Sequence, residues 1–164
     1  MNLIAVTDKN HGLGYMGKLL YNIPDDMKFF KEKTVGKVVV MGLATLLSFP
    51  CGKPLSNRTN IVLSDVKIDI GGITVCGSLD ELFEVLKQYP NEDVYVIGGE
   101  SVYNQLIDYC EYSYITEVDA VAEADKFLHK VFDAAAWQKI EESDEMLSNG
   151  IRYRFCKYRN LAIK

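Results

Sequence analysis

The chain has 164 residues, of which 48% are hydrophobic and 25% are charged, as is ordinary for a globular protein. Its net charge of -5 and pI of about 5.1 argue against a nucleic acid or an anionic membrane as the partner. We therefore expect a single domain over residues 1–164, monomeric by default, with a core large enough to fold by itself.

Cysteine and histidine usage gives no sign of a metal site or of a disulfide framework. The four cysteines lie far apart without a CxxC pair, and the chain has only two histidines. Residues 1–6 lack the basic start of a signal peptide, and no apolar run reaches the roughly 18 residues of a membrane span. We expect a reduced, cytoplasmic protein without a bound metal.

The first half of the chain predicts strands and helices in alternation. An apolar strand over 3–7 precedes a segment over 10–18 with three glycines, which is typical of a mobile surface loop. A helix is expected over 24–33. The β-branched run 37–42 is apolar on both faces and predicts a central strand, and a short helix over 43–48 follows it.

The second half continues the alternation. Further strands are expected over 60–64, 73–76, 93–97, 112–118 and 152–158. Further helices are expected over 100–109 and from Ser78 to about residue 88, where Ser78 and Glu81 form a capping box. The pattern predicts an α/β fold with a mostly parallel central sheet flanked by helices and an antiparallel C-terminal edge hairpin.

A single carboxylate, Asp26, stands among the apolar side chains of the expected helix over 24–33. Pro24 suits the first position of that helix, and Asp26 lies four residues before Phe30, on the same face. Because Ile23 and Met27 make this face apolar, the carboxylate is drawn toward the interior, where it must be paired, protonated or used. Two readings stay open: an acid stabilised by the helix dipole, and a recognition group for a flat, nitrogen-rich ligand.

Two further segments carry groups suited to binding anions. Gly98 and Gly99 follow a strand and precede a helix, so backbone N–H groups there can approach a phosphate closely. The pair is not the GxGxxG fingerprint, and a tight connection is the alternative. Arg58 stands at the entrance of the strand over 60–64, where it either grips a carboxylate or lies in solvent.

The chain carries a set of characteristic stretches in a fixed order. They are Ile4-Ala5-Val6, Gly12-Leu13-Gly14, the run from Ile23 to Lys31, Val39-Val40-Met41-Gly42, Pro54-Leu55 with Arg58, Asn60-Ile61-Val62-Leu63-Ser64, Val96-Ile97-Gly98-Gly99 with Tyr103, and Thr116. This ordered set, which spans residues 3–158, resembles the dihydrofolate reductase family. The order and the number of the stretches make the resemblance specific, although no single stretch decides it.

The resemblance implies NADPH-dependent reduction of 7,8-dihydrofolate to 5,6,7,8-tetrahydrofolate by hydride transfer, in one-carbon metabolism. Asp26, supported by Thr116, would orient the pterin and promote protonation of its N5 by water, with Tyr21 beside the site. Further substrate contacts would come from Val6, Met27, Phe30, Lys31, Phe49, Leu55, Arg58 and Ile97. The cofactor would be bound by Ala5, Leu13, Gly14, Thr45, Leu63, Ser64, Gly98, Gly99, Ser101, Val102, Tyr103 and Gln105, and the family pattern has a cis peptide bond between Gly98 and Gly99.

Three positions depart from the family pattern on the cofactor side. Where relatives place residues that contact the cofactor phosphates, this chain has Leu43, Ala44 and Asp65. Because these residues weaken the attraction for a 2′-phosphate, two alternatives stay open beside NADPH, the cofactor that the resemblance implies: use of NADH as well, and a weakened cofactor site. Two alternatives to a working reductase remain: a folate- or nucleotide-binding relative with little turnover, and a pyrimidine reductase of riboflavin synthesis.

Overall fold

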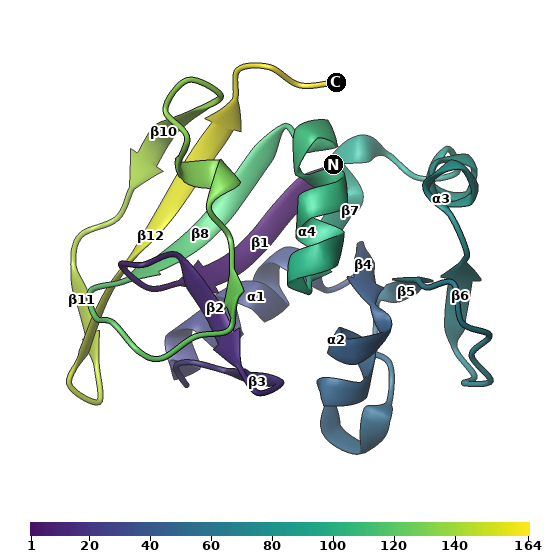
Figure 1. Ribbon diagram of the computed structural model, residues 1–164, viewed down its shortest axis with the longest axis horizontal. Helices are drawn as coiled ribbons and strands as arrows, with labels where there is room; N and C mark the ends of the chain where they lie inside the picture. Colours follow the sequence, from purple (N-terminus) through teal and green to yellow (C-terminus); the bar gives the residue numbers. More distant parts are fainter.

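Figure 1 shows the computed structural model, which describes residues 1–164. Its strands are β1 (Asn2–Thr7), β2 (Gly12–Tyr15), β3 (Lys18–Leu19), β4 (Val38–Gly42), β5 (Thr59–Leu63), β6 (Ile73–Cys76), β7 (Val94–Gly98), β8 (Tyr112–Val118), β9 (Lys126–Phe127), β10 (Trp137–Glu142), β11 (Met146–Ser148) and β12 (Ile151–Asn160). Its helices are α1 (Pro24–Thr34), α2 (Leu43–Ser48), α3 (Leu79–Leu86) and α4 (Glu100–Leu106), with 3-10 turns at Pro50–Gly52, Asn91–Asp93, Ile107–Tyr109 and Lys130–Phe132.

The main sheet is parallel over most of its width. Its strand order is β10-β12-β8-β1-β7-β4-β5-β6, with β11 paired to β12. All neighbours from β8 to β6 run parallel, whereas β12 runs antiparallel to β8, β10 and β11. The predicted α/β fold with a parallel centre and an antiparallel C-terminal edge is therefore confirmed.

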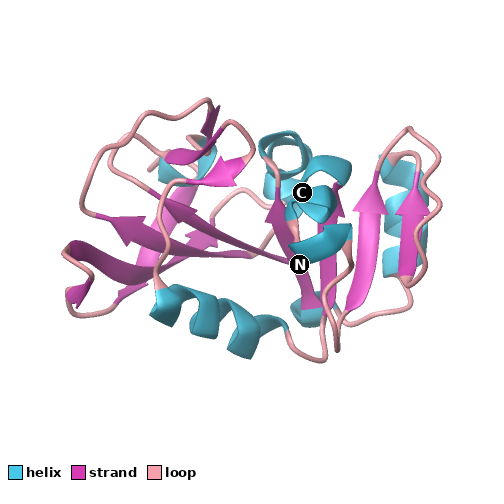
Figure 2. Cartoon of the chain, turned by 90° about the horizontal axis from the view of Figure 1, so that it is seen from below, coloured by secondary structure: helices cyan, strands magenta, loops and turns pink.

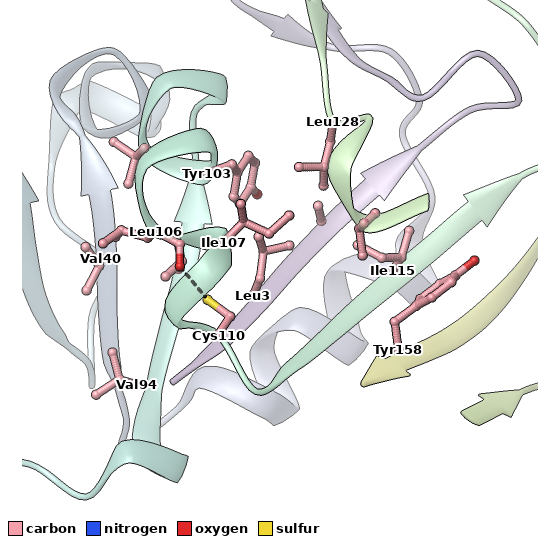
Figure 3. Close-up of a cluster of buried hydrophobic side chains, with 14 of the residues drawn as sticks. Leu3, Val40, Val94, Tyr103, Leu106, Ile107, Cys110, Ile115, Leu128 and Tyr158 are labelled. Carbon is pink, nitrogen blue, oxygen red and sulfur yellow. Dashed lines mark hydrogen bonds between the residues drawn. The ribbon is translucent and has the colours of Figure 1, made fainter. Parts of the chain in front are cut away.

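The central strands are buried from both sides because helices cover both faces of the sheet. Val39 and Val40 are fully buried although adjacent residues of a strand point to opposite faces, as the apolar run of β4 predicts. One face packs on α3 and α4, and Figure 3 shows Leu106 of α4 in the same cluster as Leu3 of β1. Figure 2 shows α1 on the opposite face from α4.

Two helices begin where the sequence predicts. Pro24 is the first residue of α1. Ser78 caps α3 by accepting a hydrogen bond of 3.2 Å from the backbone N–H of Glu81. The carboxylate of Glu81 accepts from the backbone N–H of Gly77 at 2.7 Å, one residue before the position that a capping box uses. No helix of the chain has both the length and the apolar character needed to cross a bilayer.

The glycine-rich segment after β1 is more ordered than the predicted loop. It forms β2 and β3, which join β9 in a separate three-stranded sheet. Gly12 approaches its neighbours so closely that an added Cβ would lie 2.9 Å from the Cβ of Ala124. The expectation that residues 10–18 form a loop without strands is wrong, because β2 pairs with β9, a segment far away in the sequence that a local pattern does not reveal. The mobility expected of this segment stays a prediction.

Candidate active site

A cleft of about 880 Å³ opens at the carboxyl ends of β1, β7, β4 and β5, between α1 and the β2–β3 segment. Most of the residues predicted to bind substrate or cofactor line this one cleft: Ala5, Val6, Leu13, Gly14, Asp26, Met27, Phe30, Thr45, Phe49, Leu63, Ser64, Ile97, Gly98, Gly99, Ser101, Val102, Tyr103 and Gln105. A cleft at the carboxyl ends of parallel strands is the usual position of a ligand site in open α/β sheets.

Asp26 presents a carboxylate in the part of the cleft between α1 and β8. Thr116 Oγ1 donates a hydrogen bond of 2.6 Å to Asp26 Oδ1. Burial raises the pKa of Asp26 above its usual range, and the hydrogen bond from Thr116 opposes that rise. No lysine or arginine compensates the charge. The absence of a cationic partner rules out a structural ion pair and favours the reading of Asp26 as a recognition group.

The neighbouring acid, Asp25, occupies a different environment. It is exposed, and its Oδ2 accepts a hydrogen bond of 3.0 Å from the hydroxyl of Tyr153. An exposed acid in the first turn of a helix is explained by the helix dipole and a local hydrogen bond. The helix dipole therefore accounts for Asp25. Only Asp26 occupies the half-buried position beside Thr116.

The walls beside Asp26 are apolar and partly aromatic. Phe30 and Phe49 are half-buried and line the cleft together with Val6 and Ile97. Met27 also lines the cleft, as predicted, and the residue is 52% exposed. Met27 is exposed because the face of α1 on which it lies borders the open cleft rather than the core. Flat apolar walls around one carboxylate suit a planar heterocycle.

The glycine turn, Gly98 and Gly99, lies at the end of β7 beside α2. Its peptide bond is cis, as the family pattern implies. Gly98 has φ of +126°, and a Cβ there would lie 3.4 Å from Thr45 Oγ1 and from the hydroxyl of Tyr103. A side chain at this point would fill the space above the backbone, so glycine keeps the turn open to close approach of a ligand.

Tyr103 joins the helix after the glycine turn to the strand beside it. Its hydroxyl donates a hydrogen bond of 2.8 Å to the carbonyl of Ile4, and burial raises its pKa strongly. Because the tyrosine is buried and neutral, it acts as a fixed donor between α4 and β1. The hydrogen bond joins α4 to the middle of β1, beside the glycine turn.

Arg58 is held just outside the apolar wall of the cleft. Its Nε donates a hydrogen bond of 3.2 Å to Thr34 Oγ1, and its Nη1 donates one of 2.8 Å to the carbonyl of Ser56. The guanidinium carbon lies 6.0 Å from the centre of the Phe30 ring. Arg58 is thus a positioned cation rather than a free surface arginine. Lys31, which follows Phe30 on α1, is exposed.

Two other predicted residues do not line the cleft. Tyr21 packs in a cluster with Val118 and Tyr153, and its hydroxyl is buried without a hydrogen-bond partner. Burial raises the pKa of Tyr21, and the charge of Asp8 acts in the same direction. Leu55 is half-buried against the β4–β5 side of the core. The roles predicted for these two residues stay predictions.

Leu43, Ala44 and Asp65, which stand where relatives contact the cofactor phosphates, line the cleft as well. The other lining residues were not predicted as binding residues: Ile4, Tyr15, Gly17, Lys18, Leu19, Gly42, Ser48, Pro50, Glu100 and Lys126. Gly17, Lys18 and Leu19 enter the cleft because the β2–β3 segment folds over it. Lys126 reaches the cleft because β9 pairs with β2, and its Nζ lies 3.9 Å from Glu100 Oε2. Nothing in the local sequence signals that contact.

Comparison with known proteins agrees with the geometry of the cleft. The family model described as "Dihydrofolate reductase" matches residues 1–160. The dihydrofolate reductase of Neisseria meningitidis is 33% identical over 160 residues, which cover 96% of each chain. A solved structure of dihydrofolate reductase from Enterococcus faecalis, complexed with NADP(H) and RAB-propyl, has a TM-score of 0.86 and 32% identity, covering 98% of this chain and 95% of its own.

Longer relatives also match. The bifunctional dihydrofolate reductase-thymidylate synthase 2 of Arabidopsis thaliana is 34% identical over 171 residues, which cover 93% of this chain and 30% of the relative. The chain thus spans about a third of the length of such plant relatives. The length matched in the plant relative, 171 residues, is close to the 160 residues matched in the Neisseria meningitidis protein.

Proposed function

Because this chain belongs to the dihydrofolate reductase family, we propose that it reduces 7,8-dihydrofolate to 5,6,7,8-tetrahydrofolate with NADPH. The observation that carries the proposal is the pairing of a half-buried carboxylate, Asp26, with a threonine donor in an apolar slot that continues into the glycine turn. One end of the cleft suits a planar nitrogen heterocycle, and the other suits a dinucleotide.

Asp26 recognises the pterin and supports its protonation. Thr116 occupies Oδ1, so the second carboxylate oxygen is free to accept hydrogen bonds from the 2-amino and N3 edge of the ring. A negative charge held in an apolar slot favours the protonated form of a bound base. Asp26 therefore raises the proton affinity of the pterin, and water delivers the proton to N5.

The residues present fit a reduced nicotinamide dinucleotide. Because the glycines have no side chains, the backbone of the turn is accessible beside the Thr45 hydroxyl, in space that a Cβ would occupy. An accessible backbone at this point suits a pyrophosphate. Ala5 and Ile97 line the cleft between the glycine turn and Asp26, a position that suits the nicotinamide ring. When bound, the cofactor supplies a hydride for C6 of the pterin. The side chains mainly orient the two rings and exclude water, because hydride transfer depends on alignment.

Arg58 binds the acidic tail of the substrate. The tail of dihydrofolate ends in carboxylates, and Arg58 is fixed by Thr34 and Ser56 beside the ring of Phe30. Its remaining donors can form charge-assisted hydrogen bonds with a carboxylate at the mouth of the cleft. A substrate that stretches from Asp26 past Phe30 to Arg58 distinguishes this site from one for a ribose phosphate, as a pyrimidine reductase requires.

The protein is proposed to act as a monomer in the cytoplasm. All four cysteines are free thiols, and three of them, Cys76, Cys110 and Cys156, are buried. Unpaired thiols suit a reducing compartment.

The test is dihydrofolate-dependent oxidation of NADPH with identification of the product. We expect tetrahydrofolate to form in step with NADPH consumption. A folate-binding protein without turnover would bind dihydrofolate and leave NADPH unchanged, and a pyrimidine reductase would consume NADPH only with a ribosylaminopyrimidine phosphate as substrate. Either result would overturn the proposal.

A further inference from the structure

The far end of the cleft, away from Asp26, carries one charged side chain, and it is an acid. This end is lined by Leu43 and Ala44 after β4 and by Ser64 and Asp65 after β5. The only lysines that line the cleft, Lys18 and Lys126, belong to the β3–β9 side. No arginine lines the cleft. The β4–β5 end therefore has a negative local charge.

The strand order indicates which part of a bound dinucleotide would lie near this acid. Along the edge of the sheet, β8 and β1 lie at the Asp26 end, β7 carries the glycine turn, and β4 and β5 follow. If the reacting ring lies near Asp26 and the pyrophosphate at the glycine turn, as the proposed function requires, the adenosine half would extend over β4 and β5. Asp65, the second residue after β5, would then lie beside the adenosine ribose.

The side chain of Asp65 is exposed and takes part in no hydrogen bond or ion pair. Its neighbour Ser64 is occupied, because Ser64 Oγ accepts a hydrogen bond of 3.1 Å from the backbone N–H of Val66. Lys67, the nearest cation in the sequence, does not line the cleft. Asp65 thus remains free to meet the ribose, and no lining cation at this end offsets its charge.

A carboxylate beside the adenosine ribose distinguishes the two nicotinamide dinucleotides. An acid after a strand accepts hydrogen bonds from the 2′-hydroxyl of NAD-type cofactors, whereas a basic residue favours the 2′-phosphate of NADP-type cofactors. At a solvent-exposed position, the charge of Asp65 lowers the affinity for a dianionic phosphate within a few ångströms by about tenfold. Leu43 and Ala44 supply no compensating charge.

We propose that Asp65 is a specificity-determining residue that makes the protein accept NADH about as well as NADPH, with less than about tenfold preference for either. The proposal rests on the proposed function for the identity of the cofactor, but it concerns only the adenosine end of the cleft.

The first test measures ligand binding at the adenosine end of the cleft alone, without folate and without turnover. Calorimetry measures the dissociation constants of 2′,5′-ADP and of 5′-AMP, which differ only by the 2′-phosphate. For the unchanged protein we expect the two constants to agree within about tenfold. Asp65→Asn keeps the shape and removes the charge, so it should improve binding of 2′,5′-ADP by about tenfold and leave 5′-AMP nearly unchanged. Asp69→Asn removes an exposed charge of the same loop that does not line the cleft, and it should change neither constant.

The second test compares kcat/KM for NADPH and NADH with dihydrofolate. For the unchanged protein we expect the two kcat/KM values to agree within about tenfold. Their ratio should shift toward NADPH in Asp65→Asn, and further in Asp65→Asn with Ala44→Arg. Binding of 2′,5′-ADP at least a hundredfold tighter than 5′-AMP, or no change in that ratio in Asp65→Asn, would overturn the inference. The predicted fragment binding without any reduction of dihydrofolate would overturn the proposed function and leave the role of Asp65 standing.

Discussion

Thr116 Oγ1 donates a hydrogen bond of 2.6 Å to Asp26 Oδ1, and this contact joins the middle of the sheet to the first turn of α1 across 90 residues of sequence. The threonine fixes one oxygen of the carboxylate and leaves the other for a ligand. The geometry explains how a buried acid can be tolerated without a cation, and it is the basis of the first three predictions.

Replacement of Asp26 by asparagine should reduce turnover of dihydrofolate at pH 7 by about a hundredfold or more, because the amide carries no charge to favour a protonated pterin. The loss should shrink at low pH, where the substrate arrives protonated. Steady-state pH profiles of both proteins check this. Asp25→Asn is the matched control, because Asp25 is exposed and outside the cleft, and it should retain activity within a few fold. Equal profiles for Asp26→Asn and the unchanged protein would contradict the role of Asp26.

The same substitution should not destabilise the folded protein at neutral pH. The folded-state pKa of Asp26 is raised by burial, so the native state holds its proton more tightly than the unfolded state. The free energy of unfolding therefore decreases as the pH rises from about 3.9, the pKa of an unfolded aspartate, through the raised pKa of Asp26 in the folded state. Above that pKa the decrease is complete and remains constant. Asp26→Asn lacks this ionisation. Its thermal midpoint should equal or exceed that of the unchanged protein at pH 7, and the advantage should diminish toward pH 4. A markedly lower midpoint at pH 7 would show that the charged carboxylate stabilises the fold.

Thr116 is predicted to be a positioning residue that acts through the pKa of Asp26. Its hydrogen bond lowers that pKa, so Thr116→Val should raise it further and move the acidic limb of the kcat/KM profile to higher pH. Thr116→Ser retains the hydroxyl, so the acidic limb of its kcat/KM profile should lie at the same pH as in the unchanged protein. If Thr116→Val changes stability and leaves the profile in place, the hydrogen bond has only a structural role.

The glycine turn should tolerate no side chain at its first residue. Gly98→Ala would place a Cβ at a φ of +126° and 3.4 Å from Thr45 Oγ1 and the Tyr103 hydroxyl. We expect NADPH to bind at least tenfold more weakly, as measured by titration of the cofactor, together with a lower thermal midpoint. Gly71→Ala is the control, because Gly71 is exposed and a Cβ there meets nothing within 4 Å. Unchanged binding in Gly98→Ala would show that the cofactor does not approach this turn.

Arg58 is expected to affect only substrates with an acidic tail. Arg58→Ala should raise the KM for dihydrofolate by about ten- to a hundredfold, the effect of one lost charge-assisted interaction, with a smaller change in kcat. A reduced pterin without the glutamate tail is the matched substrate, and its KM should not respond. A similar increase for both substrates would mean that Arg58 shapes the pterin slot through Phe30 instead.

The central strands and the position of Asp26 follow from local patterns. The run of β4 is apolar on both faces, and Pro24 sets the start of the helix that carries Asp26. By contrast, β10 has one buried residue, Trp137, among exposed ones, so its pattern does not predict a strand. It exists because the long β12 offers an edge for pairing. Predictions from sequence fail where the partner segment, rather than the local composition, determines the structure.

The candidate site likewise combines parts that local patterns predict with parts that distant pairing determines. The strand ends, the glycine turn and the acid of α1 lie together because parallel strands share one edge, and the ordered set of stretches identifies them. The contact of Lys126 with Glu100 and the covering position of Lys18 arise from the small β2–β3–β9 sheet. That sheet depends on close packing at Gly12, which only the three-dimensional structure reveals.

The most direct test of the central claim is the transfer of deuterium to dihydrofolate from NADPH that carries deuterium at both positions of C4 of the nicotinamide, with the product analysed by mass spectrometry. Direct hydride transfer within the cleft predicts tetrahydrofolate that carries a single deuterium at C6 and forms in step with cofactor oxidation. Oxidation of the cofactor without deuterated tetrahydrofolate, or no oxidation at all, would contradict the account.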